Sequence, residues 1–146
     1  MAVTQSSAGT QVLEFRLGSD RYCVDISYVA EIVDVHGVTP VPNAPRHVRG
    51  VMDLRGRTTT IIDPTVRLNL DATSEADRII VFDPEHADGE SVGWVVDEVD
   101  EVSSVPPDAV DEAPVQHEQS ARGIVRRDDG LVIWLRPETA TADRVA

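Results

Sequence analysis

The chain has 146 residues, of which 41% are hydrophobic and 27% charged, so it is long enough and apolar enough for one folded domain. Its 26 acidic residues outnumber the 13 basic ones and give a net charge of −13. Such a charge repels nucleic-acid phosphates and anionic lipid heads, which argues against both as partners.

Every basic residue is Arg, and the chain contains no Lys. Schiff-base chemistry, a Walker A nucleotide site and a biotin or lipoyl attachment site all need Lys and are excluded. The missing Lys, the acid excess and the preference for Asp over Glu are typical of proteins from halophilic archaea that accumulate salt. The sequence therefore predicts a halophilic origin, with an acidic protein of an ordinary cell as the alternative.

The first half of the chain predicts a hairpin and then one short helix. Alternation of Leu13, Phe15 and Leu17 with polar residues indicates a half-buried strand, and the turn at 18–20 leads to a returning strand over 21–26. Apolar residues then recur at helical spacing over 27–35, with Gly37 as a stop signal.

The rest of the chain predicts further short strands. They are expected at residues 58–62, 79–82, 92–96, 123–126 and 131–135. Asp129-Gly130, between the last two, is a strong hairpin signal, typical of a type I′ turn. We expect about eight to ten strands, the signature of a β-sandwich or barrel. No apolar run approaches the roughly 20 residues of a spanning helix, and no secretory signal is present, so the expected location is cytoplasmic.

Known catalytic and metal-binding motifs are missing from the sequence. The four His residues lie far apart, and Cys23 is the only cysteine, so a cysteine-based metal cluster is excluded. Cys23 is flanked by Tyr22 and Val24, which predicts a buried, unreactive thiol. We expect no catalytic, cofactor-binding or metal-binding residues. A metal- or carboxylate-dependent hydrolase on a β-barrel is the enzyme alternative.

An ordered series of motifs resembles the CheW-like family of chemotaxis coupling proteins. The matching stretches are residues 12–18, 22–26, 29–32, 41–45, 48–51, 61–63, 93–99, 123–125 and 129–135. The most specific is Asp53-Leu54-Arg55-Gly56, where the family usually has Asn-Leu-Arg-Gly; the Asp could alter one polar contact near Arg55. The resemblance covers residues 11–137, with flexible ends expected at 1–10 and 138–146.

The resemblance implies an all-β fold of two small five-stranded SH3-like barrels packed side by side, with a hydrophobic groove between them. It also implies a non-catalytic adaptor without cofactors that couples the cytoplasmic tips of methyl-accepting chemoreceptors to the regulatory domain of the histidine kinase CheA. Such a protein would work at receptor arrays on the inner face of the membrane, without inserting into the bilayer. An adaptor of another kinase pathway, such as pilus motility, is an alternative.

Four residues are candidates for partner binding. Val29 and Ile79 match apolar positions that face receptor helices in the family, although both could be plain core. Glu31 could lie at the rim of the groove or on a solvated face. Arg55 has a planar donor fork suited to carboxylates, and could either line the groove or form an internal ion pair with Asp53, Asp63 or Glu31. Asp53 and Gly56 are predicted to be structural turn residues.

Stability is predicted to rise steeply with salt. Like charges on a small surface repel, and raising the ionic strength from about 0.1 M to 1 M shortens the Debye length from about 10 Å to about 3 Å. Salts excluded from the surface also strengthen apolar burial. Thermal unfolding in KCl between about 0.1 and 3 M measures this; an unchanged melting temperature would refute the halophilic prediction.

Overall fold

Short strands joined by tight turns make up most of the computed structural model, which describes residues 9–70, 77–86, 89–114 and 120–137. In chain order the strands are β1 (Thr10–Leu17), β2 (Asp20–Asp25), β3 (Val29–Asp34), β4 (Val48–Leu54), β5 (Arg57–Ile62), β6 (Arg78–Phe82), β7 (Val92–Val96), β8 (Glu98–Val105), β9 (Val110–Asp111), β10 (Ala121–Arg127) and β11 (Gly130–Leu135). The short helical segments between them are the 3-10 helices η1 (Ile26–Tyr28), η2 (Pro84–His86) and η3 (Pro107–Ala109), and the α-helix α2 (Pro64–Arg67).

The ends that the sequence predicts to be flexible, 1–10 and 138–146, lie outside the described residues except for the last two of the first stretch. Of these, Thr10 already belongs to β1. No helix in the described part of the chain is long and apolar enough to cross a bilayer.

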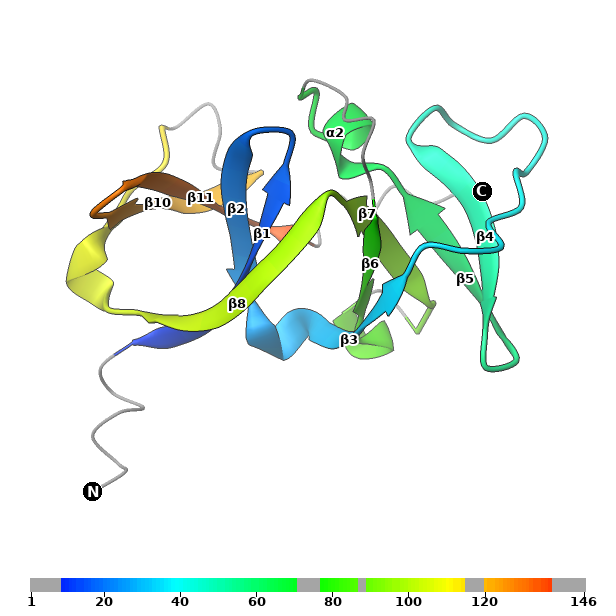
Figure 1. Cartoon of the computed structure of the whole chain (residues 1–146), viewed down its shortest axis with the longest axis horizontal. Helices are drawn as coiled ribbons and strands as arrows, with labels where there is room; N and C mark the ends of the chain where they lie inside the picture. Colours follow the sequence, from blue (N-terminus) through cyan, green and yellow to red (C-terminus); the bar gives the residue numbers. More distant parts are fainter. Residues whose placement is uncertain (1–8, 71–76, 87–88, 115–119, 138–146) are drawn as a thin grey trace.

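The strands form two curled sheets that lie side by side along the long axis of the molecule (Figure 1). The first barrel has the strand order β8-β1-β2-β11-β10-β9, and the second barrel has the order β3-β6-β7-β5-β4. This confirms the all-β class and the two-barrel architecture. The first barrel has six strands rather than five because the two-residue β9 pairs with β10.

The second barrel is inserted into the first along the chain. The chain leaves the first barrel after β2 through η1 and returns from β7 directly into β8. Asp97 is the single residue between β7 and β8, and its N–H donates to the carbonyl of Arg16 at 3.0 Å. Its side-chain Oδ2 accepts from the N–H of Gly18 at 2.6 Å. Asp97 therefore fastens the β1–β2 turn to the junction between the barrels.

Three apolar clusters fill the molecule, one inside each barrel and one between them. The interior of the first barrel contains Val12, Cys23, Val105, Val125, Val132 and Trp134. The interior of the second barrel contains Met52, Ile61, Ile79, Val81 and Val95. The shared core between the barrels contains Leu13, Phe15, Leu17, Tyr22, Val24, Ile62, Ile80, Phe82, Val92, Trp94, Val96 and Leu135.

Trp94 lies in the shared core and is fully buried. Its ring meets Phe82 of its own barrel edge-on at a centroid distance of 4.9 Å, and Phe15 of the first barrel at 6.2 Å. Gly93, beside it, leaves room on the opposite face of β7, because a Cβ there would lie 2.6 Å from Cγ2 of Ile79. This glycine lets β6 and β7 pack closely inside the second barrel.

Strands that face two cores are buried on both sides, so the predicted alternation of β1 is wrong at Glu14. Glu14 is only 5% exposed, because it lies on the same face of the strand as Val12. Its carboxylate accepts hydrogen bonds from Arg127 and from Oγ of Ser103, the latter at 2.7 Å. Cys23, opposite Glu14 in the register, is fully buried, and burial raises the pKa of its thiol to about 12.

The helix predicted over residues 27–35 is wrong over most of its length. The chain forms only the three-residue η1, capped by Asp25, and then the strand β3. Residues 29–34 alternate between half-buried and exposed, and β3 pairs antiparallel with β6. Val29, Ile32 and Val33 are β-branched and fit a pleated surface, so tertiary pairing overrides the helical spacing.

Both predicted hairpins, β1–β2 and β10–β11, are confirmed, but the turn type predicted for β10–β11 is wrong. Gly18 has φ +67, as the first central residue of a type II′ turn requires. The β10–β11 hairpin turns at Asp128 and Asp129, neither of which has positive φ, so the type I′ prediction there is wrong. The positive φ falls instead on Gly130, where β11 begins.

Ile79 is fully buried inside the second barrel, packed in the cluster that contains Ile61 and Val95. Of the two roles considered for Ile79, partner contact and plain core, the structure supports plain core: Ile79 and Val81 pack inside the barrel, and Ile80 and Phe82 pack in the shared core. A partner has no access to it.

Ile79→Arg is expected to unfold the protein, because an unpaired charge buried in an apolar interior costs several kcal/mol, roughly the whole stability of a domain. Far-UV circular dichroism and melting temperature measure the effect. Ile32→Arg is the matched control, because Ile32 lies on the adjacent strand and is already 36% exposed. A folded Ile79→Arg variant with an unchanged melting temperature would contradict this placement.

Candidate partner-binding site

The hairpin between β4 and β5 presents an arginine at its tip. Leu54 pairs with Arg57, which leaves Arg55 and Gly56 as a two-residue turn. Their φ values of +52 and +85 are those of a type I′ turn, which favours Asn, Asp or Gly. Gly56 is therefore at a position that needs its conformational freedom, as expected. Arg55 adopts a backbone conformation that its side chain disfavours, so an arginine at this tip is not explained by turn geometry.

Arg55 forms an ion pair with Glu31 of β3, which decides between the partners considered from the sequence. The Arg55 side chain is 69% exposed and that of Glu31 30% exposed, so the pair lies at the surface. The hydrogen bond to Glu31 and its negative charge raise the pKa of the Arg55 guanidinium. The pair joins the edge strand β3 to the β4–β5 turn, at the two opposite edges of the second sheet.

The other two carboxylates considered for Arg55 have different positions. Asp63 is buried at the start of α2, where its Oδ1 accepts from the backbone N–H and the hydroxyl of Thr65. Its Oδ2 lies 3.4 Å from Arg49. Asp53 is exposed on β4, opposite Thr58, one pair from the turn.

A cavity of about 310 Å³ opens beside the Arg55–Glu31 pair. Its apolar lining residues are Ala30, Leu54 and Pro84, together with Val81 and Phe82, which are almost fully buried. Arg57 also lines it, and donates a hydrogen bond from Nη2 to the carbonyl of Gly89 at 2.8 Å. The combination of guanidinium groups and apolar side chains suits an amphipathic protein segment that presents a carboxylate beside apolar residues.

Val29 lies at the start of β3, opposite Phe82. It is half-buried and packs against the shared core, so part of the side chain is accessible. A register shift between Val29 and Glu31 sets the two residues on either side of a bulge, where edge strands often re-aim their side chains. Of the four candidates, the structure brings Glu31 and Arg55 together, leaves Val29 nearby on the same strand as Glu31, and removes Ile79 to the interior.

Sequence reasoning missed Arg57 and the apolar side chains of the cavity. Leu54 belongs to the motif Asp53-Leu54-Arg55-Gly56 and Arg57 follows it directly, so both could have been found by considering every residue of that motif and the next one. Phe82 and Val81 belong to a continuous apolar run, which carries no sign that its end reaches a surface cavity. Among the described residues, no group of three or more His, Cys, Asp or Glu side chains could hold a metal ion.

Two β-barrels around a shared core, with a charged and apolar surface site, define a protein-binding module. The profile of the CheW-like domain matches residues 11–144, and the chain belongs to the CheW-like family. It is 33% identical to the chemotaxis protein CheW of Rhizobium meliloti over 68% of this chain and 64% of that protein. It is 30% identical to the chemotaxis protein CheW of Bacillus subtilis over 85% of this chain and 81% of that protein.

The fold is also similar to a solved structure. The crystal structure of the scaffolding protein TtCheW from Thermoanaerobacter tengcongensis matches with a TM-score of 0.78 and 25% sequence identity, over 88% of this chain and 89% of that one. The match covers most of the chain, so the two-barrel arrangement is shared with that scaffolding protein.

Arg55→Ala is expected to lower the affinity for a partner about tenfold, as for an arginine that loses its water when a partner binds, while the melting temperature changes little. The small effect on folding follows from the exposure of the ion pair. Partner pull-down and thermal unfolding are measured on the same preparation.

Arg78→Ala is the matched control, because Arg78 also pairs with a carboxylate of β3, Asp34 at 3.3 Å, at the surface of the same barrel and outside the cavity. Equal binding losses in the two variants would contradict a specific role for Arg55. A variant that unfolds while its folded fraction binds normally would make Arg55 a purely structural residue.

Proposed function

We propose that this protein is a non-catalytic adaptor that couples methyl-accepting chemoreceptors to the histidine kinase CheA in chemotaxis. Membership of the CheW-like family, with the fold matched across both barrels, is the observation that carries the proposal. An adaptor of this kind works in the cytoplasm, at receptor arrays on the inner face of the membrane, and needs no cofactor.

Partner binding is assigned to Val29, Glu31 and Arg55. Of these, Glu31 and Arg55 line the cavity together with Leu54 and Arg57. The family resemblance implies a partner whose tip, that of a chemoreceptor, is a helical hairpin. Apolar grooves bind the apolar faces of helices. In this proposal Val29 contacts a receptor helix. The Arg55–Glu31 pair lies at the rim and selects against helices with the wrong charge.

The decisive experiment reconstitutes the three components in vitro. A soluble cytoplasmic receptor fragment and CheA from the same organism are mixed with and without this protein, and autophosphorylation of the kinase is followed. The assay is run at about 0.2 M and about 3 M KCl, because the composition predicts a protein adapted to salt. Receptor control of the kinase that depends on this protein supports the proposal.

Co-purification from cells separates the alternatives. Recovery of a chemoreceptor together with CheA supports the chemotaxis role. Recovery of a different kinase without any chemoreceptor would contradict it and favour an adaptor of another pathway. A stoichiometric metal ion in the purified protein, together with hydrolytic activity, would contradict the non-catalytic assignment.

A further inference from the structure

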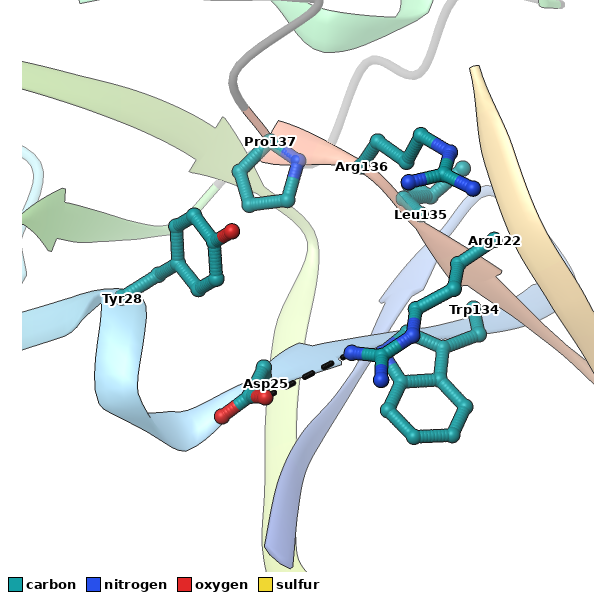
Figure 2. A pocket seen from close by; sticks show the side chains of 7 residues that line it. All are labelled: Asp25, Tyr28, Arg122, Trp134, Leu135, Arg136 and Pro137. Atoms are coloured by element: carbon teal, nitrogen blue, oxygen red, sulfur yellow. Dashed lines mark ion pairs between the residues drawn. The ribbon is translucent and has the colours of Figure 1, made fainter. Parts of the chain in front are cut away.

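A second surface cavity, of about 260 Å³, lies where η1 approaches the first barrel (Figure 2). Asp25 and Tyr28 border it on one side, and Arg122 and Trp134 on the other. Arg136 also lines it. We call this cavity the Arg122 pocket. It shares none of its lining residues with the cavity beside Arg55.

A β-bulge directs Arg122 into this pocket. Ala121 pairs with Leu135 and Gly123 with Trp134, so Arg122 is the extra residue between two consecutive pairs. Gly123 is needed beside it, because a Cβ at that position would lie 2.7 Å from Cγ1 of Val110. Bulges of this kind occur where a strand re-aims a side chain for function.

The guanidinium of Arg122 is held in place but not saturated. Its Cζ lies 4.3 Å from the centroid of the Trp134 ring, and one of its nitrogens lies 3.5 Å from Oδ2 of Asp25. Asp25 is itself fixed, because its Oδ1 accepts from the N–H and the hydroxyl of Ser27. A guanidinium has five N–H donors, and the 3.5 Å contact is longer than a charge-assisted hydrogen bond. Donors therefore remain for a ligand, on a side chain that is 45% exposed.

The charges of the pocket favour an anionic ligand. The guanidinium groups of Arg122 and Arg136 and the single carboxylate of Asp25 line it, on a protein with a net charge of −13. Stacking on Trp134 restricts the side chain before binding, so less conformational entropy is lost when the ligand arrives. A carboxylate matches the planar fork of donors that Arg122 presents.

The pocket is next in the chain to a residue assigned to the receptor, because Tyr28 lines it and Val29 directly follows Tyr28. We propose that the Arg122 pocket receives an Asp or Glu side chain of the chemoreceptor segment that docks across Val29. The inference rests on the proposed function and extends its contact surface from the second barrel to the first. It adds Arg122 as a specificity-determining residue.

The test measures binding of a soluble cytoplasmic receptor fragment, and separately of the kinase regulatory domain, by titration calorimetry. Arg122→Gln keeps the stem over Trp134 and removes the charge, and is expected to weaken receptor binding about tenfold while kinase binding stays within about twofold. Arg122→Lys is expected to weaken receptor binding nearly as much, because a point charge cannot make two parallel N–H···O bonds.

Arg126→Gln is the matched control. Arg126 lies on the same strand, is half exposed and pairs with Asp111 at 2.7 Å, outside the pocket. Receptor variants with single Asp→Asn or Glu→Gln changes then form double-mutant cycles with Arg122→Gln. Removing the charge of one receptor carboxylate is expected to weaken binding to the unchanged adaptor about tenfold and to leave binding to the Arg122→Gln variant unchanged.

Each outcome separates this inference from the function on which it rests. Unchanged receptor affinity of Arg122→Gln, with normal binding by the unchanged protein, overturns the pocket alone. Loss of kinase binding instead of receptor binding, equal losses in Arg126→Gln, or full rescue by Lys also overturn it. If the unchanged protein binds no receptor fragment, the proposed function fails and the pocket assignment fails with it.

Discussion

The shared core between the barrels is the constraint on which the rest of the structure depends. Trp94, Phe15 and Phe82 meet there edge to face, and strands of both barrels contribute side chains around them. Truncating a buried aromatic side chain of this size costs about 3–5 kcal/mol in typical cores. Because neither barrel covers its own side of this cluster, each needs the other to exclude water from it.

The shared core also positions the surface sites. It fixes β6 and β7 from one side, which places Phe82 against Val29 and β3. It holds β2 and β11 from the other barrel, and these strands carry Asp25 and Trp134 to the Arg122 pocket. Both sites therefore lie on one body. A partner segment that docks across both barrels needs contact sites whose relative positions are fixed, and a common core supplies this.

The sequence predicted the elements whose pattern depends on local physics. The hairpins at residues 18–20 and 127–130, the apolar run of β6 and the turn glycine Gly56 all follow from turn chemistry and periodicity.

The errors lie where a strand faces two cores. Glu14 looked exposed, but side-chain alternation in a doubly buried strand does not tell inside from outside. Ile79 was a partner-binding candidate from the family resemblance alone, and its burial matches the alternative of plain core. The strand β3 was mistaken for a helix because its apolar spacing fits both periods. The bulge at Arg122 and the Arg57 side of the cavity depend on pairing distant in sequence, which no local pattern reveals.

Native-state hydrogen exchange in low denaturant tests the shared core most directly. Amide groups of β11 in the first barrel and of β7 in the second are compared residue by residue. If the barrels depend on one core, both sets exchange only through global unfolding, with the same free energy and the same denaturant dependence. Two separate exchange free energies, one for each barrel, would show that the barrels unfold independently and would contradict this account.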